Sequence, residues 1–259
     1  MSRLTVGNAE LDYRLDGPSE APVLMLSNSL GTALAMWEPQ LPALTERFRV
    51  LRYDARGHGR SSVAPGPYAI AQMGEDALAL LRHVGARRAH FCGLSMGGMV
   101  GMWLGIHAPT VIDRLVLCNT AARIGPPDNW NARIARVREG GMTAIVEAVL
   151  ARWFTPGFID RGAPAVQQAR AMLLATSPEG YCAACAAVRD KDQRDDIGRI
   201  LAPTLVVAGT RDVVCTPDEH RFLAERIDGA RYVELDAPHL SNLEQPAAYT
   251  RALVDFLTE

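Results

Sequence analysis

Residues 93–97 read Gly-Leu-Ser-Met-Gly and give the strongest local signal in this chain of 259 residues. They follow an apolar stretch at 90–92 and open a helical pattern over 96–107, so the serine is expected on a sharp turn between a strand and a helix. Such a turn strains the backbone, and side chains two positions away would collide, so glycine occupies both positions. The turn places the Ser95 hydroxyl beside a helix N-terminus, whose free N–H groups favour negative charge. Ser95 is therefore a candidate nucleophile.

The chain on either side of this motif alternates short apolar stretches with longer helical patterns. Strands are expected at 4–6, 11–15, 23–27, 50–53, 90–93, 114–118, 203–208 and 231–235. Helices are expected at 69–84, 96–107, 217–227 and 245–257. The stretch Val-Leu-Met-Leu at 23–26 is apolar without alternation, which is typical of a parallel strand buried on both faces. The pattern predicts an α/β fold with a mostly parallel central sheet flanked by helices.

Residues 121–196 differ from the rest because they show helical periodicity and no convincing strand. Gly-Pro-Pro at 125–127, Thr-Pro-Gly at 155–157 and Ser-Pro at 177–178 punctuate them. The simplest organisation is an α/β core of residues 1–120 and 197–259, with 121–196 inserted as a helical cap after the sixth strand.

Composition excludes several classes of protein. Hydrophobic residues at 48% and charged residues at 22% are ordinary globular values, which exclude disorder and a fibrous fold. The net charge of −2 offers no basic surface for nucleic acid or for an anionic membrane. Lys191 is the only lysine, so a Schiff base or P-loop lysine is excluded elsewhere. Neither a signal peptide nor an apolar stretch of membrane-spanning length is visible, so we expect a cytoplasmic protein.

The five cysteines indicate packing rather than redox or metal chemistry. Cys182 and Cys185 form a Cys-x-x-Cys pair, but they stand in an alanine-rich stretch that reads as a helix interior. A redox pair would be expected at the start of a helix that follows a strand. No metal or organic cofactor is expected.

A serine nucleophile needs a base, and the chain has six histidines. His239 lies on the loop that follows the expected strand at 231–235. A histidine beyond the carboxyl end of a strand can reach the crevice where ligands bind in open α/β sheets. His239 is therefore the candidate base, since the other five stand in or beside expected elements or in a glycine-flanked loop.

The third residue must accept the other imidazole N–H and so fix the tautomer of the base. Asp212 follows the expected strand at 203–208, again at its carboxyl end, and is the candidate acid. Asp236 is a competitor, although it stands only three residues before His239. Asn119 occupies the end of the sixth strand, but its amide cannot carry the charge.

Acyl transfer also needs N–H donors for the developing oxyanion. One donor would be the backbone N–H of Met96, directly after the candidate nucleophile. The other is expected from the loop after the third strand, Ser-Asn-Ser-Leu-Gly-Thr at 27–32, where the N–H of Leu30 is the candidate.

The order Ser95, Asp212, His239 resembles that of the α/β-hydrolases. Residues 54–61, Asp-Ala-Arg-Gly-His-Gly-Arg-Ser, resemble the loop after that family's fourth strand. Within the family the chain is most similar to the 3-oxoadipate enol-lactonases, and the likeness spans nearly the whole chain. The stretches that carry it are NSLGT at 28–32, GLSMGG at 93–98, WFTP at 153–156, GY at 180–181, RDKD at 189–192 and HLSN at 239–242. The usual His-Gly before the oxyanion loop is replaced by Asn28-Ser29, which this subfamily tolerates.

The resemblance implies hydrolysis of a small anionic lactone, 3-oxoadipate enol-lactone, in the β-ketoadipate pathway of aromatic-compound catabolism. Ser95 would attack the ring carbonyl with His239 as base, and water would then release 3-oxoadipate from the acyl-enzyme. The leaving enolate becomes a ketone, so its expulsion needs little acid assistance.

The free carboxylate of that substrate requires a cationic partner, which we expect in the cap. Arg133 is the first candidate because it stands three residues after Trp130 on one helix face, although a solvated arginine would show the same spacing. Arg189 and Arg152 are the other candidates. Trp130 and Trp153 are candidate pocket walls, and a packing role for Trp153 is equally open.

Three other functions share the core motifs. A general carboxylesterase or perhydrolase would differ only in the cap, and a hydrolase that cleaves C–C bonds of ring-fission products would use the same triad. A small-molecule receptor can also retain a triad without turning substrate over. Haloalkane dehalogenase and epoxide hydrolase chemistry would need a carboxylate at position 95, so Ser95 argues against both. The oligomeric state stays open.

Overall fold

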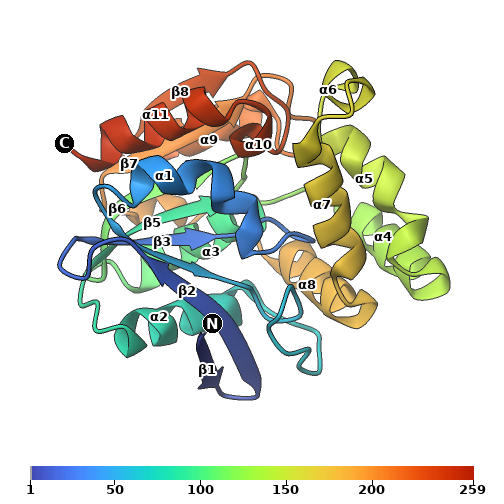
Figure 1. Cartoon of the computed structure of the whole chain (residues 1–259), viewed down its shortest axis with the longest axis horizontal. Coiled ribbons are helices and arrows are strands. Elements are labelled where there is room, and N and C mark those ends of the chain that lie inside the picture. The colour runs from blue at the N-terminus through green and yellow to red at the C-terminus, as the bar shows by residue number, and fades with distance from the viewer. Residues whose placement is uncertain (1) are drawn as a thin grey trace.

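The computed structural model describes residues 2–259, and an eight-stranded sheet forms its centre (Figure 1). The strands lie in the order β1-β2-β4-β3-β5-β6-β7-β8. β2 pairs antiparallel with β1 and with β4, whereas all other neighbours are parallel. Their bounds are Ser2–Val6 (β1), Ala9–Asp16 (β2), Val23–Ser27 (β3), Arg49–Tyr53 (β4), Ala89–Leu94 (β5), Ile112–Cys118 (β6), Thr204–Gly209 (β7) and Arg231–Leu235 (β8).

Helices cover both faces of this sheet. Figure 1 shows α2 (Ile70–His83) and α3 (Met96–His107) together on one face, with α1 (Leu41–Leu44) and α11 (Pro246–Leu257) on the other. The central strands β3, β5 and β7 are buried at every residue, as expected for parallel strands covered on both faces. The other helical elements of the core are η1 (Leu34–Gln40), η3 (Ile197–Arg199), α9 (Pro217–Arg226) and α10 (Ser241–Glu244).

Between β6 and β7 the chain leaves the sheet and forms a group of helices at one end of it, on the right in Figure 1. These are α4 (Pro127–Gly140), η2 (Met142–Ala144), α5 (Val146–Trp153), α6 (Pro156–Asp160), α7 (Pro164–Ala175) and α8 (Pro178–Asp190). We refer to them as the cap. Residues 121–196 contain no strand in this structure, while their division from the core as a separate domain stays a prediction.

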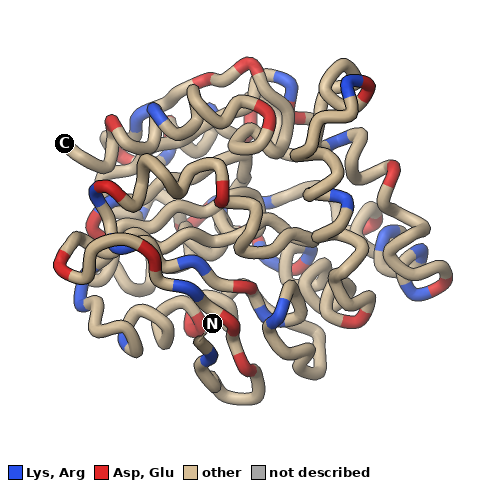
Figure 2. The backbone as a smooth tube through the Cα atoms, in the orientation of Figure 1, with Lys and Arg blue, Asp and Glu red and all other residues tan. Residues whose placement is uncertain are grey.

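The predicted fold class is confirmed, with small differences at element ends. The strand expected at 203–208 begins one residue later, because Pro203 has no N–H to donate and contributes only its carbonyl, which accepts from the N–H of Leu115. Basic and acidic residues are mixed along the chain rather than gathered in one region (Figure 2). Within residues 2–259, no helix combines the length and the apolar character that crossing a bilayer requires.

Candidate active site

Ser95 stands on a strained turn between β5 and α3. Its backbone has φ 58° and ψ −116°, a conformation that non-glycine residues rarely adopt. The neighbouring glycines are required by space: a Cβ on Gly93 would lie 2.1 Å from the carbonyl oxygen of Gly97, and one on Gly97 would lie 2.2 Å from that of Ser27. The turn is held from β6, because the N–H of Ser95 donates to the carbonyl of Cys118 at 2.9 Å.

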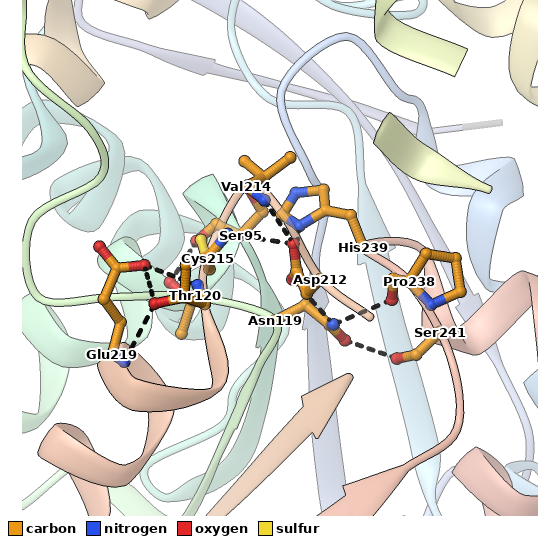
Figure 3. Close-up of polar contacts among 11 residues, drawn as sticks. Ser95, Asn119, Thr120, Asp212, Val214, Cys215, Glu219, Pro238, His239 and Ser241 are labelled. Atoms are coloured by element: carbon orange, nitrogen blue, oxygen red, sulfur yellow. Dashed lines mark hydrogen bonds and ion pairs between the residues drawn. The ribbon is translucent and has the colours of Figure 1, made fainter. Parts of the chain in front are cut away.

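His239 and Asp212 form a buried pair beside this turn (Figure 3). The Nδ1 atom of His239 lies 2.9 Å from Oδ2 of Asp212, and both side chains are almost fully buried. The backbone N–H groups of Val214 and Cys215 donate to the other oxygen of Asp212, Oδ1, at 2.8 and 3.0 Å. Burial alone would raise the pKa of Asp212, but His239 and the hydrogen-bond donors outweigh it and hold that pKa below its ordinary value. Asp212 is therefore an ionised acceptor for the imidazole N–H.

Asn119 joins the same network from the end of β6. Its Nδ2 donates to Oδ2 of Asp212 at 3.0 Å and to the carbonyl of Pro238 at 3.2 Å, and its Oδ1 accepts from the hydroxyl of Ser241 at 2.5 Å. Sequence reasoning considered Asn119 only as a possible acid. The one signal that could have found it is its position, a polar residue at a strand end next to those of the candidate triad.

Ser95 and His239 line one small cavity between the sheet and the cap, with about 20 Å³ of open space. The core contributes Ser29, Leu30, Ser95, Val214 and His239, and the cap contributes Trp130, Arg133, Val149, Arg152, Trp153 and Tyr181. Larger grooves of about 560 and 850 Å³ lie elsewhere and contain neither Ser95 nor His239. Because the smaller space is about that of one water molecule, side chains that line it must move before a larger ligand can bind.

The charged cap residues of this cavity are both cations. The guanidinium of Arg133 lies 4.8 Å from the centre of the Trp130 ring. Partial loss of solvent contact, and then the charge of Arg133, lower the pKa of Arg152, so the two guanidinium groups are close enough to repel. No Asp or Glu stands among the residues that line the cavity, and within residues 2–259 neither arginine has an ion-pair partner. The cavity is therefore suited to an anion.

The structure does not bring Arg189 to this cavity. Its guanidinium bonds Asp190 at 2.6 Å and Asn131 at 2.8 Å, and it lines the groove of about 850 Å³ that α4 and α8 form with the core residues 66–67. Helical periodicity could not show whether Arg189 faces the cavity or the groove, because it does not say which side of α8 faces the sheet. Trp130, Arg133, Arg152 and Trp153 all do line the cavity.

The two backbone donors proposed for an oxyanion come from adjacent segments. The N–H of Gly97 donates to the carbonyl of Asn28 at 3.0 Å, which holds the loop after β3 against the first turn of α3. Leu30 of that loop lines the cavity, and Met96 is the first residue of α3. Two further hydrogen bonds hold this loop in place, since the side-chain amide of Asn28 donates to the carbonyl of Tyr53 in β4 and accepts from the indole of Trp37 in η1.

Asp212, Cys215 and His239 also present an oxygen, a sulfur and a nitrogen within 4.8 Å of one another, a set that could hold a metal ion. A metal there would have to replace the hydrogen bond between His239 and Asp212. The geometry of a serine, an imidazole and an ionised carboxylate instead supports nucleophilic attack by a hydroxyl with a general base.

Comparison with known proteins gives consistent matches over the whole chain. The profile of the alpha/beta hydrolase fold matches residues 22–246. 3-Oxoadipate enol-lactonase 2 of Acinetobacter baylyi is 43% identical over 250 residues, which are 96% of this chain and 94% of that protein. The crystal structure of the enol-lactonase from Burkholderia xenovorans LB400 is 48% identical, covers 100% of both chains and superimposes with a TM-score of 0.98. A hydrolase from Pseudomonas aeruginosa PA01 is 52% identical, with a TM-score of 0.97 over 100% of this chain and 98% of that one.

Proposed function

The chain belongs to the α/β-hydrolase family, and from this premise we propose that it hydrolyses 3-oxoadipate enol-lactone to 3-oxoadipate. It is an enzyme that hydrolyses carboxylic ester bonds, as its enol-lactonase relatives do. The observation that carries the choice of substrate is the pair Arg133 and Arg152 in the cavity that also contains Ser95 and His239. The carboxylate of an anionic lactone bound by these arginines would leave the ring carbonyl directed toward Ser95.

In the proposed mechanism, Ser95 attacks the ring carbonyl carbon of the lactone while the free ring nitrogen of His239 takes the hydroxyl proton. Asp212 accepts the other imidazole N–H and stabilises the imidazolium that forms. The N–H groups of Leu30 and Met96 stabilise the charge that develops on the carbonyl oxygen.

Collapse of this intermediate breaks the ring C–O bond and leaves an acyl group on Ser95. The leaving oxygen departs as an enolate, which takes the proton held by His239 and becomes a ketone, so His239 is neutral again. A water molecule that gives its proton to His239 then attacks the acyl carbon, and 3-oxoadipate leaves with the Ser95 hydroxyl restored. No step needs a metal or an organic cofactor. The pathway of aromatic-compound catabolism and the cytoplasmic location stay predictions.

Steady-state kinetics on two substrates test this proposal. We expect kcat/KM for 3-oxoadipate enol-lactone to exceed that for the neutral ester p-nitrophenyl acetate by about a thousandfold, roughly 4 kcal/mol of differential transition-state binding. Ser95→Ala should lower kcat on both by several orders of magnitude, and Ser19→Ala, a change at an exposed serine, should not. Equal rates on the two substrates would favour a general esterase, and activity that survives Ser95→Ala would exclude the proposed nucleophile.

A further inference from the structure

The cap is hydrogen-bonded to the segment that follows His239 through residues 153–155 of the Trp-Phe-Thr-Pro stretch. The N–H of Leu240, the residue after His239, donates to the carbonyl of Trp153 at 3.1 Å. Thr155 donates twice to the carboxylate of Glu244, from its N–H to Oε2 at 3.0 Å and from its hydroxyl to Oε1 at 2.5 Å. Three hydrogen bonds therefore connect α5 and α6 to the segment that carries the candidate base.

Thr155 uses its hydroxyl for this link rather than to cap its own helix. Thr155 is the N-cap residue of α6, a position at which a threonine side chain ordinarily accepts from an N–H of its own helix. Here the side chain makes no capping bond and instead donates to Glu244. Within residues 2–259, Thr155 is the only hydrogen-bond partner of that carboxylate, and no Lys or Arg forms an ion pair with it. Hydrogen bonds to an ionised acceptor are stronger than neutral ones, so the pair is suited to hold two segments together.

The link acts on both parts of the candidate site. The Trp153 side chain lines the cavity, while its carbonyl holds Leu240. Glu244 ends α10, the short helix that starts two residues after His239. A shift of α5 and α6 away from the sheet would therefore move the cavity wall and the base relative to each other. Displacements of about 1 Å at a catalytic group can lower a rate by about a hundredfold.

We propose that Thr155 and Glu244 are positioning residues, which hold the His239 segment and the Trp153 wall in one fixed arrangement. They act through His239 and Trp153 and do not touch the substrate. The proposal rests on the triad of the proposed function, but it does not depend on which ester is hydrolysed.

The test measures how well His239 activates Ser95 without using the lactone. A fluorophosphonate reacts covalently with a serine that a base activates, so its second-order labelling rate reports this activation. We expect Thr155→Val, which removes one hydroxyl, and Glu244→Ala to lower the labelling rate and kcat on p-nitrophenyl acetate by about tenfold or more. Thr155→Ser keeps both donors and should restore the wild-type rate within about twofold. Thr143→Val changes another cap threonine, whose hydroxyl bonds only the Gly140 carbonyl, and should have no effect.

Thermal melting of each variant separates positioning from loss of fold. Labelling rates per folded protein that match the wild type in both Thr155→Val and Glu244→Ala would overturn the proposal, even if melting temperatures fell. If Glu244→Ala fails to fold, Thr155→Val alone decides the question, because it removes a single oxygen. If the wild-type protein reacts normally with the fluorophosphonate but does not hydrolyse the lactone, the proposed substrate is wrong. The same variants then still test the positioning role of Thr155 and Glu244.

Discussion

Asn119 Nδ2 lies 3.0 Å from Oδ2 of Asp212, the same carboxylate oxygen that accepts from His239 Nδ1 at 2.9 Å. Asn119 is fully buried and has a φ of 44°, a left-handed conformation that asparagine and aspartate tolerate better than most residues. Its other bonds, to Pro238 and Ser241, lie on either side of His239 (Figure 3). One amide therefore contacts the candidate acid and the residues on both sides of the candidate base.

Asn119→Asp should lower kcat on any ester substrate by about tenfold or more. The substitution keeps the backbone preference and the size of the side chain, but it replaces a donor to Asp212 by a second carboxyl group. Two carboxylates at this distance disfavour each other's ionisation, so the pKa of the pair rises and the hydrogen bond to His239 weakens. The measurement is kcat together with the fluorophosphonate labelling rate. Ser241→Ala, which removes only the bond to Oδ1, is the milder control, and wild-type rates in Asn119→Asp would show that Asn119 does not orient Asp212.

Arg133→Ala and Arg152→Ala should each lower kcat/KM for the anionic lactone and leave p-nitrophenyl acetate nearly unchanged. A hydrogen bond to a charged group contributes about 1.5–3 kcal/mol, so the loss at Arg133 should be about tenfold to a hundredfold. Arg152 is more exposed, so its effect should be smaller. Arg136→Ala is the matched control, because Arg136 belongs to the same helix as Arg133 but does not line the Ser95 cavity. Equal losses on the charged and the neutral substrate would argue against an anion site.

Gly97→Ala should destabilise the fold and abolish activity. The added Cβ would lie 2.2 Å from the backbone carbonyl oxygen of Ser27, which cannot move without shifting β3. Overpacking of this kind costs about 1–3 kcal/mol or more, and about 1 kcal/mol lowers Tm by about 2–4 °C in a chain of this size. Gly157→Ala is the control, since a Cβ there meets nothing within 4 Å, and it should change Tm little. Thermal melting followed by circular dichroism compares the Tm values of the two variants, and equal values would contradict the steric argument.

The candidate triad could be predicted from sequence because each member follows a strand that hydrophobic patterning reveals. Ser95, Asp212 and His239 all stand just beyond the carboxyl ends of parallel strands, which meet at one edge of the sheet. The expectation required only the order of strands and helices, not any side-chain contact. The same logic located the loop that carries Leu30.

The cap could not be predicted to the same depth, because its contacts join residues far apart in the chain. Thr155 and Glu244 are 89 residues apart, and nothing in either local sequence indicates the other. The spacing of Trp130 and Arg133 placed both on one face of α4, and both line the cavity. The same kind of reasoning failed to place Arg189, since the side of α8 that faces the sheet depends on how α8 packs against α4. Periodicity defines a face of a helix, and only tertiary packing decides what that face meets.

The free energy of unfolding should fall as the pH drops from about 6.5 toward 4. Burial lowers the pKa of both His58 and His220 to about 4, so each stays neutral in the folded state while the unfolded chain takes up protons near its ordinary pKa of 6.5. The unfolded state then binds more protons in this window, which lowers stability by up to about 3 kcal/mol for each histidine, with no further loss below it. Urea unfolding at pH 7.5, 6 and 5 measures how the free energy of unfolding changes with pH. His220→Phe should remove the contribution of one histidine, up to about 3 kcal/mol over this window, and His107→Gln, at an exposed position, should leave the pH dependence unchanged. A wild-type slope in His220→Phe would mean that protonation of the unfolded chain at this residue does not drive the acid sensitivity.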